Sequence, residues 1–167
     1  PAKPPGAVNG GLLTTVSRDI YRAQVGSEAA KRMRWFAETR MNPALNSGIA
    51  TRNSLMNEPV SNLANSDRHR TDILHEYFVP RGAYNDFIAE ARKILMAQDL
   101  PILNASIRIV HQEDIALNYA PVPAFSLVLY VNQPTTEDGN RQMRDLTRKL
   151  IDLTLQHGGR FFLPYQL

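Results

Sequence analysis

Residues 103–111, LNASIRIVH, alternate between apolar and polar side chains and carry the clearest chemical signal in the sequence. In an extended strand, successive side chains point to opposite faces, so Asn104, Ser106 and Arg108 would share one face. Amide, hydroxyl and guanidinium groups in a row form a donor-rich surface suited to contacting a specific ligand. The opposite, apolar face would carry Leu103, Ala105, Ile107 and Ile109. The polar face is therefore either a solvated outer surface or one wall of a binding site.

Other chemistries have weaker support. The four histidines do not have the spacing of metal ligands, so no metal site is expected. Ser106 lacks the His and Asp pattern that a hydrolase nucleophile needs. The chain has no cysteine, which excludes disulfides, thiolate metal sites and cysteine nucleophiles. Arg108 also has a structural interpretation, as a surface ion pair with Glu76 across strands, which would contribute little stability.

Length and composition predict one globular domain of ordinary size. The chain has 167 residues, of which 43% are hydrophobic and 21% charged. No run approaches the roughly 18 apolar residues of a membrane span and no signal peptide is visible, so we expect a soluble protein, either cytoplasmic or periplasmic. The net charge is +3, but the basic residues of the region 18–40 are interspersed with acidic ones, as on a solvated helix face. Nucleic acid is therefore not an expected partner.

The first part of the sequence is less regular than the second. Residues 1–11 are rich in Pro and Gly and are interpreted as a linker or a disordered start. Residues 12–41 have a helical pattern with a break at Gly26, after which Ser27 is a suitable N-cap. Trp35 on the second helix is expected in a core. Residues 44–70 are polar and are interpreted as a long irregular segment, so residues 12–70 form a region of helices and loop.

The second part predicts an α+β fold with an antiparallel sheet. Strands are expected at residues 72–79, 103–111 and 124–132, helices at 84–98 and 140–156, and a last extended piece at 160–165. This order, β-α-β-β-α-β over residues 72–167, is that of the ferredoxin-like arrangement, in which both helices cover one face of the sheet. The helices would take the apolar face and leave Asn104, Ser106 and Arg108 on the uncovered side. Either His75 and Tyr77 or Leu74, Glu76 and Phe78 would join them, together with Ser126, Val128 and Tyr130.

Three strings in this region resemble a known family. DILHEYFVP, LNASIRIVHQEDIALNYA and HGGRFFLPYQL together resemble the cap, or substrate, domain of FAD-linked oxidases of the vanillyl-alcohol-oxidase type, and within it the sugar-alcohol and aldonolactone oxidase branch. The resemblance covers residues 52–167. It implies a cap whose open sheet face lies over the flavin ring, positions an alcohol or sugar-like substrate, and belongs to an oxidoreductase that transfers hydride from the substrate to FAD.

The resemblance also implies roles for individual residues. The family's strand often shows Glu-x-Arg over the flavin; here Arg108 occupies the Arg position and Ser106 the Glu position. Arg108 could stabilise the reduced flavin, whereas Ser106 can hydrogen-bond but cannot act as a carboxylate base. Tyr165 is the candidate polar residue facing the flavin near the end of the chain. The substrate-binding candidates are Asn104, His111, Tyr119 and Glu76.

This chain has no GxGxxG string, so the resemblance implies that FAD is held mainly by an FAD-binding domain of the same protein, missing from this chain, and that the chain alone is inactive.

Two further interpretations stay open beside the cap. A stand-alone ferredoxin-like module that binds a small molecule or regulates, and that forms a homodimer through its open face, would need no such domain. An RNA-binding sheet is less consistent with the residues. Sheets that bind RNA stack bases on exposed aromatic side chains of their central strands, whereas the strand here offers Asn104, Ser106 and Arg108.

Overall fold

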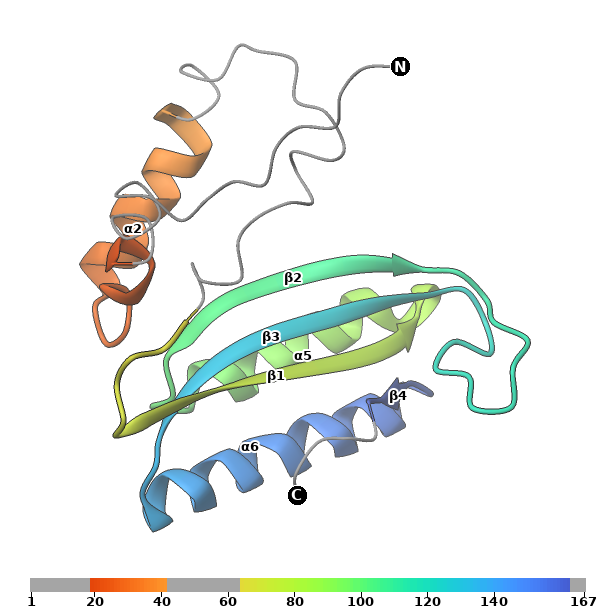
Figure 1. The fold of residues 1–167 in the computed structure, drawn as a ribbon. Helices are drawn as coiled ribbons and strands as arrows, with labels where there is room; N and C mark the ends of the chain where they lie inside the picture. The colour runs from red at the N-terminus through yellow and green to blue at the C-terminus, as the bar shows by residue number, and fades with distance from the viewer. Residues whose placement is uncertain (1–18, 42–63, 163–167) are drawn as a thin grey trace, which may run out of the picture. The chain divides into compact units, whose positions relative to one another are not determined.

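The computed structural model describes residues 19–41 and 64–162, and the chain divides into two units, Pro1–Ser66 and Asp67–Leu167. The second unit contains a four-stranded antiparallel sheet with the strand order β2-β3-β1-β4 (Figure 1). The strands are β1 (Arg70–Pro80), β2 (Ile102–Val110), β3 (Ala124–Pro134) and β4 (Arg160–Phe161), and the helices are α5 (Tyr84–Met96), after a 3-10 turn η3 (Arg81–Ala83), and α6 (Glu137–Gln156). The predicted α+β class is confirmed.

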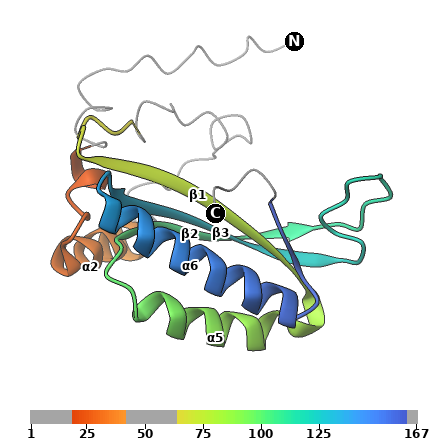
Figure 2. The ribbon, with the colours of Figure 1, turned by 90° about the horizontal axis from the view of Figure 1, so that it is seen from below.

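Both helices lie side by side on one face of this sheet (Figure 2). Each helix connects two strands that are not neighbours: β3 lies between β1 and β2, which α5 connects, and β1 lies between β3 and β4, which α6 connects. Two βαβ units are interleaved in this way in a split βαβ arrangement. The opposite face of the sheet carries neither helix, and we call it the open face.

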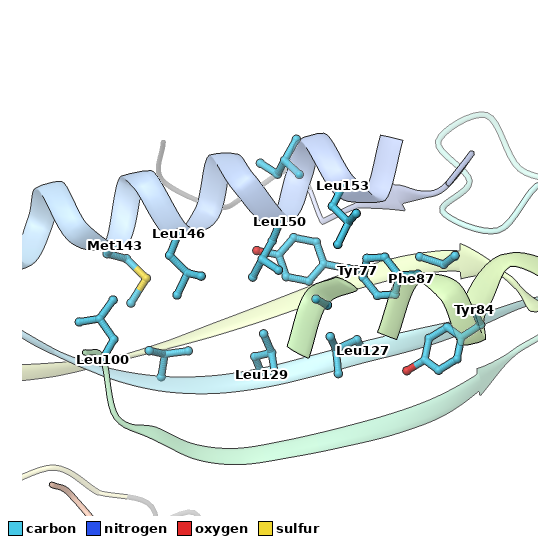
Figure 3. Close-up of a cluster of buried hydrophobic side chains, with 14 residues drawn as sticks. Tyr77, Tyr84, Phe87, Leu100, Leu127, Leu129, Met143, Leu146, Leu150 and Leu153 are labelled. Carbon is cyan, nitrogen blue, oxygen red and sulfur yellow. The ribbon is translucent and has the colours of Figure 1, made fainter. Parts of the chain in front are cut away.

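The hydrophobic core lies between the two helices and the odd-numbered residues of β1 and β3. Tyr77 and Leu129 are fully buried there, and they face Leu146 and Leu150 of α6 and Phe87 of α5 (Figure 3). Burying one such side chain contributes about 1.5–3 kcal/mol relative to leaving it in water. Every second residue of the strands and the apolar stripe of each helix therefore form one apolar layer. This layer fixes the side of the sheet on which the helices pack.

The ends of α6 are set by its capping residues. Thr136 is extended and its side-chain oxygen accepts a hydrogen bond from the Gly139 amide, at 3.1 Å, so the helix begins at Glu137, three residues before the predicted start. After Gln156 the chain turns at Gly158, whose φ is +69°, a conformation that glycine adopts at little cost.

No helix in the described part of the chain is long and apolar enough to cross a membrane.

The apolar side chains of β2 depart from the prediction. Ile107 and Ile109 pair with Leu127 and Phe125 of β3 but stay 59% and 67% exposed, and Ala105 is also exposed. No residue of β2 belongs to the core cluster. Because β2 is an edge strand and the helices pack on β1 and β3, its apolar face is left uncovered. The expectation that the helices bury this face was wrong.

Leu103 behaves differently from the rest of β2. It is 4% exposed and lies at an irregularity in the pairing, because Ile102 pairs with Val131 whereas Asn104 pairs with Tyr130. One residue of β2 is therefore an extra residue with no partner on β3, which is the definition of a β-bulge. The bulge restores the alternation that places Asn104 on the open face.

The first unit contains the helix α2 (Glu28–Phe36), which continues as a π-helical turn η1 (Ala37–Met41). Gly26 has φ of +71°, and the Ser27 side chain accepts from the Ala30 amide at 3.2 Å, so the predicted break and N-cap are confirmed. Trp35 is 70% exposed, which contradicts its expected place in a core, because α2 has no buried residue. The predicted linker at residues 1–11 and most of the predicted irregular segment lie outside the described residues.

A buried histidine makes the stability of this fold sensitive to acid. His75 is 1% exposed on the core side of β1, where its Nδ1 lies 2.9 Å from the Tyr77 hydroxyl, and burial lowers its pKa to about 4. The unfolded chain, with a histidine pKa of about 6.5, binds the proton first as the pH falls. The contribution of His75 to stability is therefore complete above about pH 6.5 and is lost between about pH 6.5 and pH 4.

We expect the free energy of unfolding to fall by about 3 kcal/mol over this range from His75 alone, since one pKa unit corresponds to about 1.4 kcal/mol. Urea unfolding at several pH values would measure it. His75→Gln should flatten the curve relative to the wild-type chain in the same buffers. Parallel curves for the two proteins would show that His75 is not the titrating group.

Candidate functional site

The open face gathers most of the residues that the sequence identified. Strand pairing aligns the even-numbered residues of the three long strands in rows that run across the sheet. The rows, from β2 through β3 to β1, are Arg108, Ser126 and Phe78; Ser106, Val128 and Glu76; and Asn104, Tyr130 and Leu74. Of the two alternatives for β1, the face with Leu74, Glu76 and Phe78 is the open one, and His75 and Tyr77 lie under the helices.

Three side chains form a polar centre on this face. Ser126 is fully buried, and its hydroxyl donates to Oε1 of Glu76 at 2.8 Å. Nη1 of Arg108 lies 3.7 Å from the same oxygen, so Arg108 and Glu76 make the cross-strand ion pair that sequence reasoning considered. The Glu76 side chain is 17% exposed and the Arg108 side chain 59%. The carboxylate is thus held in place, while more than half of the Arg108 side chain remains accessible.

Glu76 supplies the carboxylate that Ser106 cannot provide on this face. Ser106 and Glu76 share a row of the open face, separated by Val128 of β3. No described residue donates a hydrogen bond to Oε2 of Glu76. Position 106 on β2 is a serine and supplies no carboxylate. The open face nevertheless has one, from Glu76 on β1, and among the described residues its Oε2 has no hydrogen-bond donor. Carboxylate oxygens accept hydrogen bonds from ligand hydroxyls.

Aromatic side chains border one end of the polar centre. The ring of Tyr119 stacks on Phe78, with centroids 5.2 Å apart and planes at 23°, and the Phe162 ring makes a tilted contact with Tyr119, with centroids 5.5 Å apart. The loop before β3 fixes this position, because the Tyr119 amide donates to Oε2 of Glu113 at 3.2 Å. Tyr119 therefore reaches the open face from outside the sheet. Its contact with Phe78 and the anchoring role of Glu113 could not be inferred from the sequence.

A second polar cluster lies at the opposite end of β1 and β3. Asp72 accepts from the Tyr130 hydroxyl at 3.2 Å and from the Asn132 side-chain amide at 2.6 Å, and Arg70 donates to the side-chain oxygen of Asn132. Sequence reasoning did not identify Asp72, Asn132 or Arg70 as site residues. The sequence contained one indication of them. These residues alternate with the core residues of the same strands, so they belong to the face that Leu74 and Tyr130 share.

Two predicted site residues are not gathered with the others. His111 follows the last paired residue of β2 and is exposed. Tyr165 lies outside the described residues. No group of three His, Cys, Asp or Glu side chains able to hold a metal occurs within residues 19–41 and 64–162.

The chemistry that this arrangement supports is ligand orientation. Around the polar centre, the face offers the Arg108 guanidinium, one oxygen of Glu76, the Asn104 amide and the Ser106 hydroxyl, beside the exposed side chain of Leu74. In the described part of the chain, neither Ser106 nor Ser126 hydrogen-bonds an imidazole, and His75 is on the other side of the sheet. A serine nucleophile activated by histidine is therefore not assembled here.

The stability of the polar centre should depend on Ser126 and not on Arg108. We expect Ser126→Ala to lower the free energy of unfolding by about 1 kcal/mol, because it removes a hydrogen bond to a partly buried carboxylate. Arg108→Met should change it by less than about 0.5 kcal/mol, because an exposed ion pair contributes little. Urea unfolding at neutral pH measures both. A larger loss for Arg108→Met would identify Arg108 as a structural residue.

Comparison with known proteins adds no relative from which a role could be carried over. No protein-family model, no curated protein and no solved structure matches the chain.

Proposed function

We propose that the open face is the substrate-recognition wall, or cap, of an FAD-dependent oxidoreductase that oxidises an alcohol-bearing substrate. The observation that carries the proposal is the exposed side chain of Arg108, held beside Glu76 and Ser126 on the sheet face that neither α5 nor α6 covers. A fixed positive charge on a half-apolar surface is what the anionic reduced flavin ring requires from one side.

The residues of the open face fit the flavin ring but not the rest of FAD. Arg108 would lie near the ring, and the exposed side chain of Leu74 would provide apolar surface. The sequence contains no GxGxxG string, the usual loop that binds the dinucleotide phosphates. The proposal therefore requires an FAD-binding domain as the partner of this chain, within the same protein.

The other polar groups would bind and orient the substrate. Glu76 has a free carboxylate oxygen that can accept a hydrogen bond from a substrate hydroxyl, and Ser126 holds the other oxygen in place. Asn104 and Ser106 add donors and acceptors for further hydroxyls, as a sugar-like substrate would need. When bound, FAD accepts hydride from the carbon that bears the hydroxyl, and the hydroxyl proton is lost as the carbonyl forms. Accepting that proton is the step for which Glu76 is the best-placed described group.

One observation favours the alternative function, a stand-alone binding module that dimerises through the open face. Leu74 is 51% exposed on that face, in a part of β1 that pairs with β3 but not with β4. A dimer would bury Leu74, but it would also bury the Arg108 guanidinium and the free oxygen of Glu76, and desolvating such charges is costly. We therefore prefer the cap. A dimer in solution that Leu74→Glu dissociates would reverse this preference.

Sulfite offers a test of Arg108 that does not require the substrate to be known. Sulfite adds to the oxidised flavin ring and leaves negative charge on it, so a nearby cation strengthens the adduct. In the FAD-loaded protein translated from the complete reading frame, we expect Arg108→Met to weaken sulfite binding about tenfold or more. The loss of flavin absorbance on titration measures the affinity.

The matched control is Arg148→Met, on the exposed side of α6 and therefore on the helix side of the sheet. It should leave sulfite affinity unchanged. Equal affinities for the wild-type protein and Arg108→Met would rule out the position of Arg108 beside the ring.

A further inference from the structure

A second candidate site lies at the β4 edge of the sheet, beyond Tyr119, the residue that also borders the polar centre of the open face. It is a pocket of about 210 Å³ between the loop that precedes β3, the C-terminal end of α6 and β4. A cavity of about 150 Å³ is large enough to hold benzene. The pocket therefore has room for a phenyl ring with a short substituent, or for a chain of about six carbons.

The wall of the pocket is mainly apolar and includes two leucines that are unusually accessible. Leu117 of the loop is 74% exposed and Leu155 of α6 is 54% exposed, and Ala116, Tyr119 and Phe161 complete the apolar lining. Large apolar side chains that gather at a concave surface mark a place where an apolar group binds. Tyr119 and Phe161 are held from behind by their contacts with Phe78 and with the core, so this wall is preformed.

Among the described residues that line this pocket, Arg160 is the only one with a charged side chain. Its Nη1 donates both to the main-chain oxygen of Asn118, at 2.6 Å, and to the side-chain oxygen of the same residue. Within residues 19–41 and 64–162, no group accepts from Nε or Nη2, and no acidic side chain pairs with Arg160. Asn118 thus fixes one edge of the guanidinium and leaves the edge formed by Nε and Nη2 available. Such an edge binds a carboxylate through two parallel hydrogen bonds.

We propose that this pocket binds a small monocarboxylate with an apolar body, such as an aryl acid or a short-chain fatty acid. The carboxylate pairs with the free edge of Arg160, and the apolar body lies between Leu117 and Leu155. Charge complementarity selects this ligand class, because the described lining combines a cation with an apolar wall and contains no acidic side chain. Binding here does not depend on flavin chemistry, and the pocket shares only Tyr119 with the residues described at the border of the open face.

Three probes of related structure test the proposal on the 167-residue chain. Phenylacetate has both features, 2-phenylethanol has the apolar body without the charge, and acetate has the charge without the body. We expect phenylacetate to bind with a dissociation constant of about a millimolar or lower, and each of the other two to bind about five- to tenfold more weakly. NMR titration measures the affinities, and the leucine methyl signals report the place of binding.

Variants separate the two parts of the site. Arg160→Gln should weaken phenylacetate to the level of 2-phenylethanol and leave 2-phenylethanol itself unchanged, whereas Leu155→Asp should weaken both. Arg108→Met, on the open face, should change neither, and a thermal melt confirms that each variant is folded. Equal affinity of phenylacetate and 2-phenylethanol, no effect of Arg160→Gln, shifts confined to other regions, or no binding of phenylacetate would each overturn the proposal.

Discussion

The packing of two helices on one side of β1 and β3 is the constraint on which the rest of this unit depends. Because α5 and α6 cover the odd-numbered residues of these strands, the even-numbered residues can carry charged groups without placing them in the core (Figure 3). The ion pair of Arg108 with Glu76 exists only on that free side. The same packing leaves the apolar edge of β2 uncovered, so one interaction accounts for both the polar centre and the exposed isoleucines.

Much of the fold could be predicted from periodicity, and the errors have identifiable causes. The strands and helices of residues 70–161 lie where alternation and the 3.6-residue period placed them, with ends that coincide or are displaced by up to three residues. The last extended piece is the exception: β4 ends at Phe161, and the predicted residues 163–165 lie outside the described part of the chain. Thr136 extends α6 because a cap depends on one side chain and not on a repeating pattern. The exposure of Ile107 could not be predicted, since it depends on which strands the helices cross. Trp35 is exposed because apolar spacing alone does not supply a packing partner.

The candidate site was predictable only in part. Asn104, Ser106 and Arg108 share a face because they belong to one strand, and the alternation of a single strand is visible in the sequence. Contacts between strands are not visible in this way. The hydrogen bond from Ser126 to Glu76 depends on the register of β1 on β3. From the sequence, either set of alternating β1 residues could have pointed to the uncovered side. The stacking of Tyr119 on Phe78 depends in addition on the path of a loop.

The central claim is that the open face works against a flavin held elsewhere in the same protein. The flavin content of the protein translated from the complete reading frame, purified without added cofactor, tests this claim most directly. The account predicts about one FAD per chain, identified by its absorbance and by the mass of the cofactor released on denaturation, or bound covalently to the polypeptide. A folded protein that neither contains FAD nor takes it up when FAD is supplied would contradict the account.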